Sequence, residues 1–290
     1  MSDHRFVIDP PQLTDPHLVV MLDGWIDASG AAAAAMGVLA AETDARELVS
    51  FDDDAYIDYR ARRPTFEIRE GVSTRLVWSS PELRHGKDRK GADVLLLSGP
   101  EPDMAWHRFA DTIASLAQQL GVRSMTALGA YPYAAPHTRP VGLSTTSPSR
   151  DVVQNLGFST SSVDVPAGVA AAIEMELHDR DIKAVGLWAQ VPHYVSAMSY
   201  PAASIALLDA LSRISGIALS ADDLRRDVAV QRERLDHLVA SNPEHVDMLG
   251  RLESAYDDAH EAGDMSTLEM RSGDDLAAEV EQFLRDHPKG

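Results

Sequence analysis

Val19-Val20-Met21-Leu22-Asp23-Gly24-Trp25-Ile26-Asp27-Ala28-Ser29-Gly30 is the stretch that decides the fold, and an alanine-rich segment follows it over 31–41. An apolar run that stops at Asp-Gly predicts a buried strand, and the strong helix formers after the loop predict a helix. The polar side chains of this loop therefore fall at the carboxyl end of a strand. In open α/β sheets, ligands bind at that edge.

The same alternation of strand, loop and helix recurs along the chain. Apolar runs predict strands at 18–22, 47–51, 93–98, 124–129 and 184–191, and helical patterns cover 30–41, 104–120, 150–156, 168–179 and 201–215. This alternation is typical of a mixed, mostly parallel sheet with helices on both faces, a three-layer αβα sandwich. Two short runs at 65–69 and 74–78, joined across Glu70-Gly71-Val72, predict a β-hairpin instead.

The chain changes character after about residue 216. Three apolar stripes at helical spacing follow, made of Leu224, Val228, Leu235 and Leu238, then Leu249, Leu252, Tyr256 and Ala259, then Leu276, Val280 and Phe283. Residues 222–290 hold 18 Asp plus Glu against 8 Lys plus Arg, which is −10 of the total charge of −19. We therefore expect an αβα domain over 1–216 and an acidic helical appendage over 217–290, packed on or between subunits, with a loose linker at 262–275.

Composition and missing motifs exclude several classes of protein. A net charge of −19 provides no basic face for nucleic acid. The absence of cysteine excludes disulfides, thiolate catalysis and Cys-ligated zinc. No apolar run approaches the length of a membrane span, and the first residues do not resemble a signal peptide, so we expect a cytoplasmic protein with no membrane partner. P-loop, G-x-G-x-x-G, H-E-x-x-H and G-x-S-x-G patterns are missing, so we expect no cofactor and no metal.

Four polar loops follow four of the predicted strands, at 23–29, 98–103, 130–140 and 192–200. If these strands are parallel, the four loops gather on one rim of the sheet, and that rim is the candidate site. The side chains that we expect there are Asp23, Trp25, Asp27, Glu101, His137, Arg139 and His193.

Each of these side chains has a structural alternative. Asp23 and Asp27 can serve as a general base or as magnesium ligands, but Asp also favours turns and helix caps. Glu101 can face a ligand, while Asp103 is placed to cap the helix predicted from Met104.

The Pro-rich segment that contains Tyr131-Pro132-Tyr133, His137 and Arg139 predicts a long loop. His137 can shuttle a proton near neutral pH, and Arg139 can bind a carboxylate or phosphate. The same loop can instead form a rigid contact between subunits. His193 is either a ligand or a structural histidine.

The opening motif resembles that of the proteasome assembly chaperone 2-like family. The resemblance continues in Ser80-Pro81-Glu82-Leu83, in Gly99-Pro100-Glu101-Pro102-Asp103 with Trp106, in Pro136-His137-Thr138-Arg139-Pro140 and in Val191-Pro192-His193-Tyr194, and it covers about residues 5–260. It implies a fold similar to the nucleoside phosphorylases and related hydrolases, a homo-oligomer for which relatives suggest a trimer, and proteasome subunits as partners. The chain ends at 285–290 without the hydrophobic-Tyr-X tail of the eukaryotic chaperones, so docking by such a tail is not expected.

Two functions are compatible with these observations. The first is a non-enzymatic, homo-oligomeric binding protein that acts as a proteasome-related assembly chaperone. The alternative is a small-molecule-binding protein or a hydrolase- or phosphorylase-like enzyme that uses the rim loops, with a carboxylate as base and Arg139 holding an anion.

Overall fold

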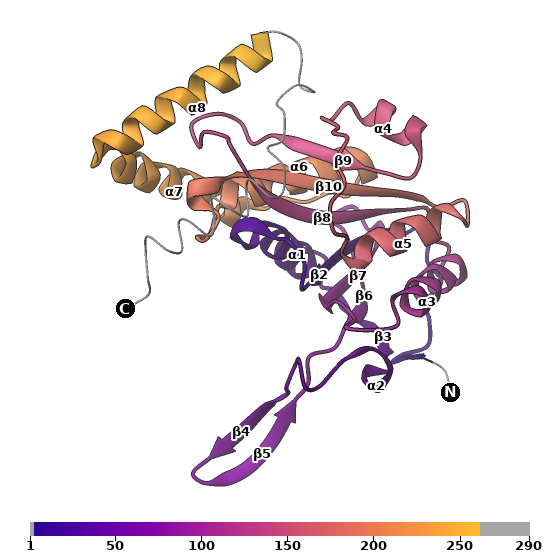
Figure 1. The fold of residues 1–290 in the computed structure, drawn as a ribbon. Helices are drawn as coiled ribbons and strands as arrows, with labels where there is room; N and C mark the ends of the chain where they lie inside the picture. The colour runs from indigo at the N-terminus through magenta and orange to yellow at the C-terminus, as the bar shows by residue number, and fades with distance from the viewer. Residues whose placement is uncertain (1–2, 262–290) are drawn as a thin grey trace.

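A computed structural model of the chain describes residues 3–261 (Figure 1). The strands are β1 (His4–Phe6), β2 (His17–Asp23), β3 (Arg46–Phe51), β4 (Thr65–Arg69), β5 (Val72–Val77), β6 (Glu82–Lys87), β7 (Asp93–Pro100), β8 (Ser124–Tyr133), β9 (Leu143–Thr146) and β10 (Lys183–Pro192). The α-helices are α1 (Ala31–Glu42), α2 (Asp53–Tyr56), α3 (Trp106–Gln119), α4 (Arg150–Leu156), α5 (Val169–His178), α6 (Pro201–Ser215), α7 (Asp222–Ala240) and α8 (Pro243–Glu261), and short 3-10 turns lie at η1 (Ala28–Gly30) and η2 (His193–Val195).

The main sheet is mixed, as the alternation predicted. Its strand order is β1-β3-β6-β7-β2-β8-β10-β9. The four central strands β7, β2, β8 and β10 are parallel, and β1, β3, β6 and β9 extend the sheet through antiparallel pairs. Strands β1, β6 and β9 were not predicted, because they are short or carry few apolar residues and so lack a periodic signal.

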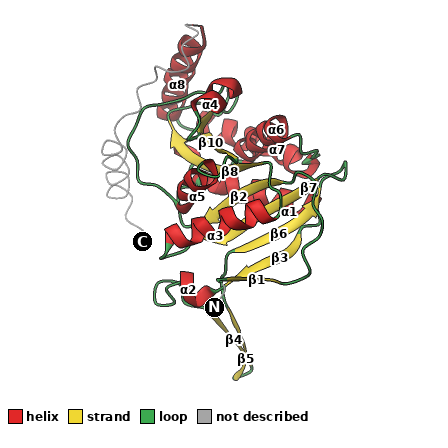
Figure 2. Ribbon diagram, turned by 90° about the vertical axis from the view of Figure 1, so that its right-hand side faces the viewer, coloured by secondary structure: helices red, strands yellow, loops and turns green. Residues whose placement is uncertain are grey.

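Helices cover both faces of this sheet, which confirms the three-layer αβα sandwich. Alternate residues of β2 point to opposite faces, so Val19 packs into the core with α1 and α6, and Val20 packs into the core with α3 and α5. The view in Figure 2 shows α3 and α5 in front of the sheet, with α6 and α7 behind it. Because both faces of the central strands are buried, those strands are almost continuously apolar.

Strand β8 is longer than predicted. It pairs in register with β10 up to Pro132 and Tyr133, so Tyr131, Pro132 and Tyr133 belong to the strand and not to the following loop. The prediction that they lie in the loop was wrong. Pro132 has no backbone N–H to donate to a neighbouring strand, but β8 tolerates the loss of this one donor because Pro132 lies near its carboxyl end.

The C-terminal helices form the predicted helical appendage over the described residues. Helix α7 packs on α6, where Leu235 joins the core, and the carboxylate of Glu42 accepts the backbone N–H groups of Ser220 and Ala221 at 2.9 and 2.6 Å. Leu238, the last residue of the first predicted stripe, is 47% exposed, and its neighbour Val239 is buried in its place. The linker at 262–275 and the stripe at 276–283 lie outside the described residues. The boundary at 216/217 and the packing between subunits remain predictions.

Strands β4 and β5 form a separate two-stranded sheet, the predicted hairpin, which extends away from the body (Figures 1 and 2). We call residues 65–77 the arm. Glu70 and Gly71 at its tip have φ of 51° and 82°, the left-handed pair that a tight hairpin turn requires.

Within residues 3–261, no helix combines the length and the apolar character that a bilayer span requires.

Candidate functional site

The carboxyl ends of the four parallel strands lie on one edge of the sheet, so the four loops meet there as expected. We call the loops at 24–30, 101–105, 134–142 and 193–200 the rim. Hydrogen bonds tie them together: the backbone N–H of Glu101 donates to the carbonyl of Asp23 at 2.7 Å, that of Ser29 to the carbonyl of Ser196 at 2.7 Å, and that of His137 to the Tyr194 hydroxyl at 2.8 Å. The rim is therefore one connected structure.

Asp27 acts as a cap for helix α1. Its two carboxylate oxygens accept the backbone N–H groups of Ala32 and Ala33 at 2.8 and 3.0 Å. Burial raises the pKa of Asp27, although these hydrogen bonds act in the opposite direction. The negative charge lies at the positive end of the helix dipole, where it stabilises the helix. The carboxylate is thus engaged by its own chain.

Glu101 serves the start of α5 in a similar way. It is 9% exposed, and its Oε2 accepts the backbone N–H of Val169 at 3.1 Å. Trp25 packs beside the same helix, with its Cγ 2.9 Å from the position that a Cβ on Gly168 would occupy. Asp23 is exposed, and its charge contributes to the raised pKa of Asp27.

Asp103 does not cap a helix, which corrects the prediction made for it. Helix α3 begins later, at Trp106, after Ala105 in a left-handed conformation. The Asp103 carboxylate instead accepts Arg62 Nε at 2.8 Å and the backbone N–H of Asp58 at 2.9 Å, which holds the segment before the arm. Residues at 58–62 are too far away in sequence for a local pattern to reveal this partner.

His137 is buried between two helical elements. Its Nδ1 lies 2.7 Å from the hydroxyl of Tyr194, and its Nε2 lies 3.1 Å from Oδ1 of Asp236 on α7. The Tyr194 hydroxyl also accepts the His137 backbone N–H at 2.8 Å, so its own proton is free to go to Nδ1. Nε2 then carries the ring proton and donates it to Asp236. Burial raises the pKa of Tyr194 to about 12, which keeps this hydroxyl protonated.

Arg139 anchors helix α8. Its guanidinium forms a two-point ion pair with Asp257 at 2.7 and 2.8 Å and reaches Glu253 at 3.2 Å, and the Thr138 hydroxyl donates to Glu253 as well. The hydrogen bond from Arg139 lowers the pKa of Asp257. The anion that Arg139 was expected to bind is therefore supplied by the appendage of the same chain.

Replacing Arg139 with Gln is expected to release α8 from the rim while leaving the sheet intact, because the two-point ion pair is lost. Hydrogen exchange read by mass spectrometry should show faster exchange along α8 and unchanged exchange in β2 and β7. Arg251→Gln, which alters an exposed arginine on the same helix, is the matched control. Equal exchange of α8 in both variants would contradict this role.

The seven candidate residues fall into two groups. Asp23, Trp25, Asp27 and Glu101 lie around the starts of α1 and α5, whereas His137 and Arg139 face α7 and α8. His193 is exposed, and its ring stacks edge-to-face on that of Tyr194 at 5.3 Å between centroids, so it belongs to the second group. Sequence reasoning missed Asp236, Glu253 and Asp257, because acidic residues on a helix ordinarily indicate a solvated face.

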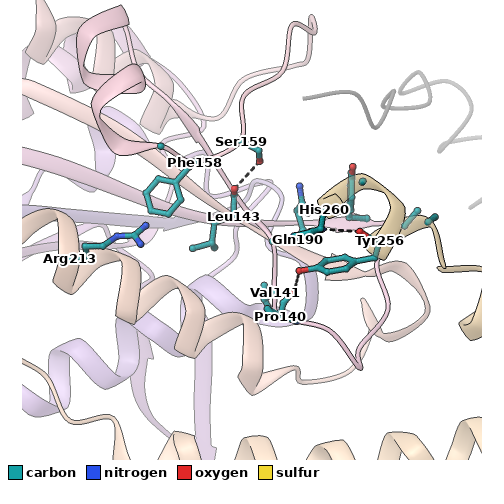
Figure 3. Close-up of a pocket in the computed structure, with 15 residues that line it drawn as sticks. Pro140, Val141, Leu143, Phe158, Ser159, Gln190, Arg213, Tyr256 and His260 are labelled. Carbon is teal, nitrogen blue, oxygen red and sulfur yellow. Dashed lines mark hydrogen bonds between the residues drawn. The ribbon is translucent and has the colours of Figure 1, made fainter. Parts of the chain in front are cut away.

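A cavity of about 360 Å³ lies behind the second group, between α8 and strand β9 (Figure 3). Tyr256 and His260 stack at 3.9 Å on one wall, and Tyr256 donates to the carbonyl of Pro140 at 3.3 Å. On the opposite wall the guanidinium of Arg213 lies 4.6 Å from the centre of the Phe158 ring. None of the seven candidate residues lines this cavity.

No cluster of three or more His, Asp or Glu side chains over residues 3–261 has the arrangement that a metal ion needs. Within the acidic run 52–54, Ser80 donates to Oδ2 of Asp53 at 2.5 Å and Tyr59 donates to Asp54 at 3.0 Å.

Comparison with known proteins gives one family and several solved relatives. A family model described as PAC2 matches residues 21–239. A protein of unknown function from Corynebacterium glutamicum is 30% identical over 89% of this chain and 98% of that chain, with a TM-score of 0.82. One of unknown function from Mycobacterium tuberculosis is 31% identical over 90% of each chain, with a TM-score of 0.81.

A second solved protein from Mycobacterium tuberculosis is described as a proteasome-assembly chaperone homologue. It is 32% identical over 80% of this chain and 99% of that chain, with a TM-score of 0.74. No curated protein matches the chain.

Proposed function

The chain belongs to the PAC2 family, and from that premise we propose that it is a non-enzymatic, homo-oligomeric binding protein that acts as a proteasome-related assembly chaperone. Its partners are further copies of itself, with a trimer as the first number to test, and proteasome subunits. It acts in the cytoplasm, without a cofactor.

The observation that carries this proposal is the character of the rim. Its charged side chains are engaged within the chain, whereas four large apolar side chains of its loops are exposed: Trp25 by 40%, Ile26 by 41%, Met104 by 45% and Met198 by 43%. Aromatic residues and methionine are enriched at protein interfaces, and methionine adapts to different partner surfaces. The rim is therefore better suited to bind a protein surface than to carry out chemistry.

The enzymatic alternative needs a free carboxylate and a free cation on the rim. Asp27 and Glu101 already accept helix N–H groups, which leaves Asp23 as the exposed candidate carboxylate, and Arg139 is already paired with Asp257 and Glu253. A general base must reach the proton that it removes, and an anion clamp must be open to its anion. These contacts argue against the hydrolase- or phosphorylase-like alternative. The solved relative described as a proteasome-assembly chaperone homologue adds support for the chaperone function.

The test uses purified proteasome α and β subunits from the source organism, mixed with this protein and examined by native mass spectrometry. We expect a complex with one subunit type that disappears as the mature particle forms. Met198→Asp should weaken that complex by about tenfold or more, because it places a charge on the exposed rim. Met175→Asp, at a 55% exposed position on α5, is the matched control.

Two outcomes would overturn the proposal. One is the absence of a complex with either subunit. The other is an equal loss of binding in the two variants, which would remove the rim as the docking surface.

A further inference from the structure

The cavity between α8 and β9 lies outside the surface that the proposed function uses (Figure 3). None of the four exposed apolar side chains named above lines it. Its volume of about 360 Å³ falls within the roughly 300–1,000 Å³ of small-molecule pockets. Its walls come mainly from 140–143, 157–159, α6 and α8, which are far apart in the sequence. The fold thus encloses a space of the size that a small ligand needs.

The charge on the walls of this cavity favours an anion. The whole chain holds 45 Asp plus Glu against 26 Lys plus Arg, yet among the described residues that line the cavity none is Asp or Glu and one is an arginine, Arg213. Asp209, one helical turn before Arg213, is paired with Arg225 instead. This neighbour therefore does not balance the charge of Arg213, and an anionic group in the cavity would.

The guanidinium of Arg213 is held ready for such a group. It lies 4.6 Å from the centre of the Phe158 ring. A guanidinium stacks through its flat face, so its N–H groups remain available in its own plane and match the two oxygens of a carboxylate. Because the ring limits the rotation of this side chain, less entropy is lost when the anion binds.

Tyr133 provides a second donor on the wall of the cavity. It lies at the carboxyl end of β8, and burial raises its pKa to about 12. Its hydroxyl therefore stays protonated in neutral solution and can donate a hydrogen bond to an anion.

The wall opposite Arg213 is flat and largely apolar. The rings of Tyr256 and His260 lie 20° from parallel with their centroids 3.9 Å apart. Hydrogen bonds fix both rings, since Tyr256 donates to the carbonyl of Pro140 at 3.3 Å and His260 Nδ1 donates to the carbonyl of Tyr256 at 2.9 Å. Val141 and Leu143 also line the space. Aromatic rings pack well against other rings, so this wall suits a planar, apolar body.

We propose that this cavity binds a small carboxylic acid with a planar, apolar body, whose carboxylate pairs with Arg213 and whose body packs between Phe158 and the Tyr256–His260 stack. The site is distinct from the seven rim candidates and involves no chemical step. It does not depend on the chaperone function, and its test uses no proteasome subunit, so either proposal can fail alone.

A ligand in this cavity would lie next to the contact that holds α8 on the rim. Arg139 pairs with Asp257 at 2.7 Å. These two residues are the chain neighbours of Pro140 and Tyr256, which line the cavity. A ligand that touches both walls binds only when the loop and the helix are together, so it stabilises their contact. Binding should slow hydrogen exchange at 140–143 and along α8 and leave the arm unchanged.

The test titrates naphthoate into the full chain by isothermal titration calorimetry. Naphthoate is a flat apolar ring system with one carboxylate, and naphthamide has nearly the same shape without the charge. Naphthoate should bind one-to-one with a dissociation constant on the order of a millimolar or tighter, and it should raise the melting temperature. Naphthamide should bind at least about tenfold more weakly, because it cannot form the charged two-point contact.

Three variants locate the site. Arg213→Gln should weaken naphthoate binding by about tenfold or more, because the cation is lost. Arg234→Gln is the matched control, since it makes the same change in net charge at an exposed position on α7 and should bind as the wild type does. Ala259→Phe should block binding without any change in charge, because it fills the cavity from α8. Circular dichroism of each variant should match the wild type, since Arg213, Arg234 and Ala259 lie outside the two buried clusters.

The inference is overturned if naphthoate shows no saturable binding at millimolar concentration, or if naphthamide binds equally well. Equal binding by Arg213→Gln and Arg234→Gln would also overturn it. Hydrogen exchange that slows only outside 140–143 and α8 would place the ligand elsewhere and exclude this cavity.

Discussion

Gly99→Ala is expected to destabilise the protein by roughly 3 kcal/mol or more. Gly99 has a φ of +109°, which side chains other than glycine rarely adopt. A Cβ at this position would lie 2.4 Å from the carbonyl oxygen of Ser80 and 3.0 Å from the Cα of Pro81. Both of these are backbone atoms, so no rotamer change can relieve the overlap.

The strain at Gly99 would act on the rim and on the root of the arm together. Gly99 lies near the carboxyl end of β7, and the segment that contains Ser80 and Pro81 returns from the arm to β6. Unfolding in urea, followed by fluorescence and circular dichroism, measures the change. Gly37→Ala is the matched control, because Gly37 is on α1 with nothing within 4 Å of a new Cβ, and it should stabilise the chain by up to about 1 kcal/mol. Equal unfolding midpoints for Gly99→Ala and the wild type would refute the argument.

Glu174→Gln is expected to stabilise the protein in alkaline solution and to leave it nearly unchanged in mild acid. Glu174 lies on α5 and is 6% exposed, and burial raises its pKa from 4.5 to about 8, while a hydrogen bond from Thr146 opposes the rise. Between these two values the folded state keeps a proton that the unfolded state releases. Stability therefore falls as the pH rises through this window.

The size of this effect follows from the difference between the pKa values of Glu174 in the unfolded and folded states. At about pH 8 the ionisable carboxyl of Glu174 lowers the free energy of unfolding of the wild type by on the order of 3–4 kcal/mol. Gln removes this loss because it keeps the shape of the side chain and cannot ionise. Urea unfolding at about pH 4 and about pH 8 should show the two proteins equal at the lower value, which lies below the window, and separated at the higher. Glu176→Gln, on the same helix and paired with Arg180 at 3.0 Å, is the control. Parallel pH profiles for Glu174→Gln and the wild type would show that the buried carboxyl does not titrate as argued.

The strands and helices of the central units and the position of the rim followed from local patterns, whereas the order of the strands in the sheet came only from the structure. The apolar run before Asp23 and the alanines after Gly30 determine a strand and a helix through short-range preferences, and three further repeats of that unit predict a sheet with parallel strands. A polar strand such as β6 gives no such signal, because its place in the sheet comes from its neighbours on both sides.

The roles of the candidate residues could not be obtained in this way. Asp27 at a strand end is equally compatible with catalysis and with capping, and only the positions of Ala32 and Ala33 show that it caps. The partners of His137 and Arg139 lie 99 and 118 residues further along the chain, on helices whose acidic residues indicated only a solvated surface.

The sequence by itself determined the αβα class, the parallel central strands, the hairpin, the acidic helices and the family, because each depends on residues within one element or on motifs in order along the chain. Tertiary structure alone decided that Asp27 and Glu101 are helix caps, that Arg139 holds α8, and that the arm stands apart with an exposed apolar face. The physical reason is that hydrogen bonds, ion pairs and burial depend on residues that are far apart in the sequence and meet only in the fold. Short-range sequence patterns do not specify which of these residues meet.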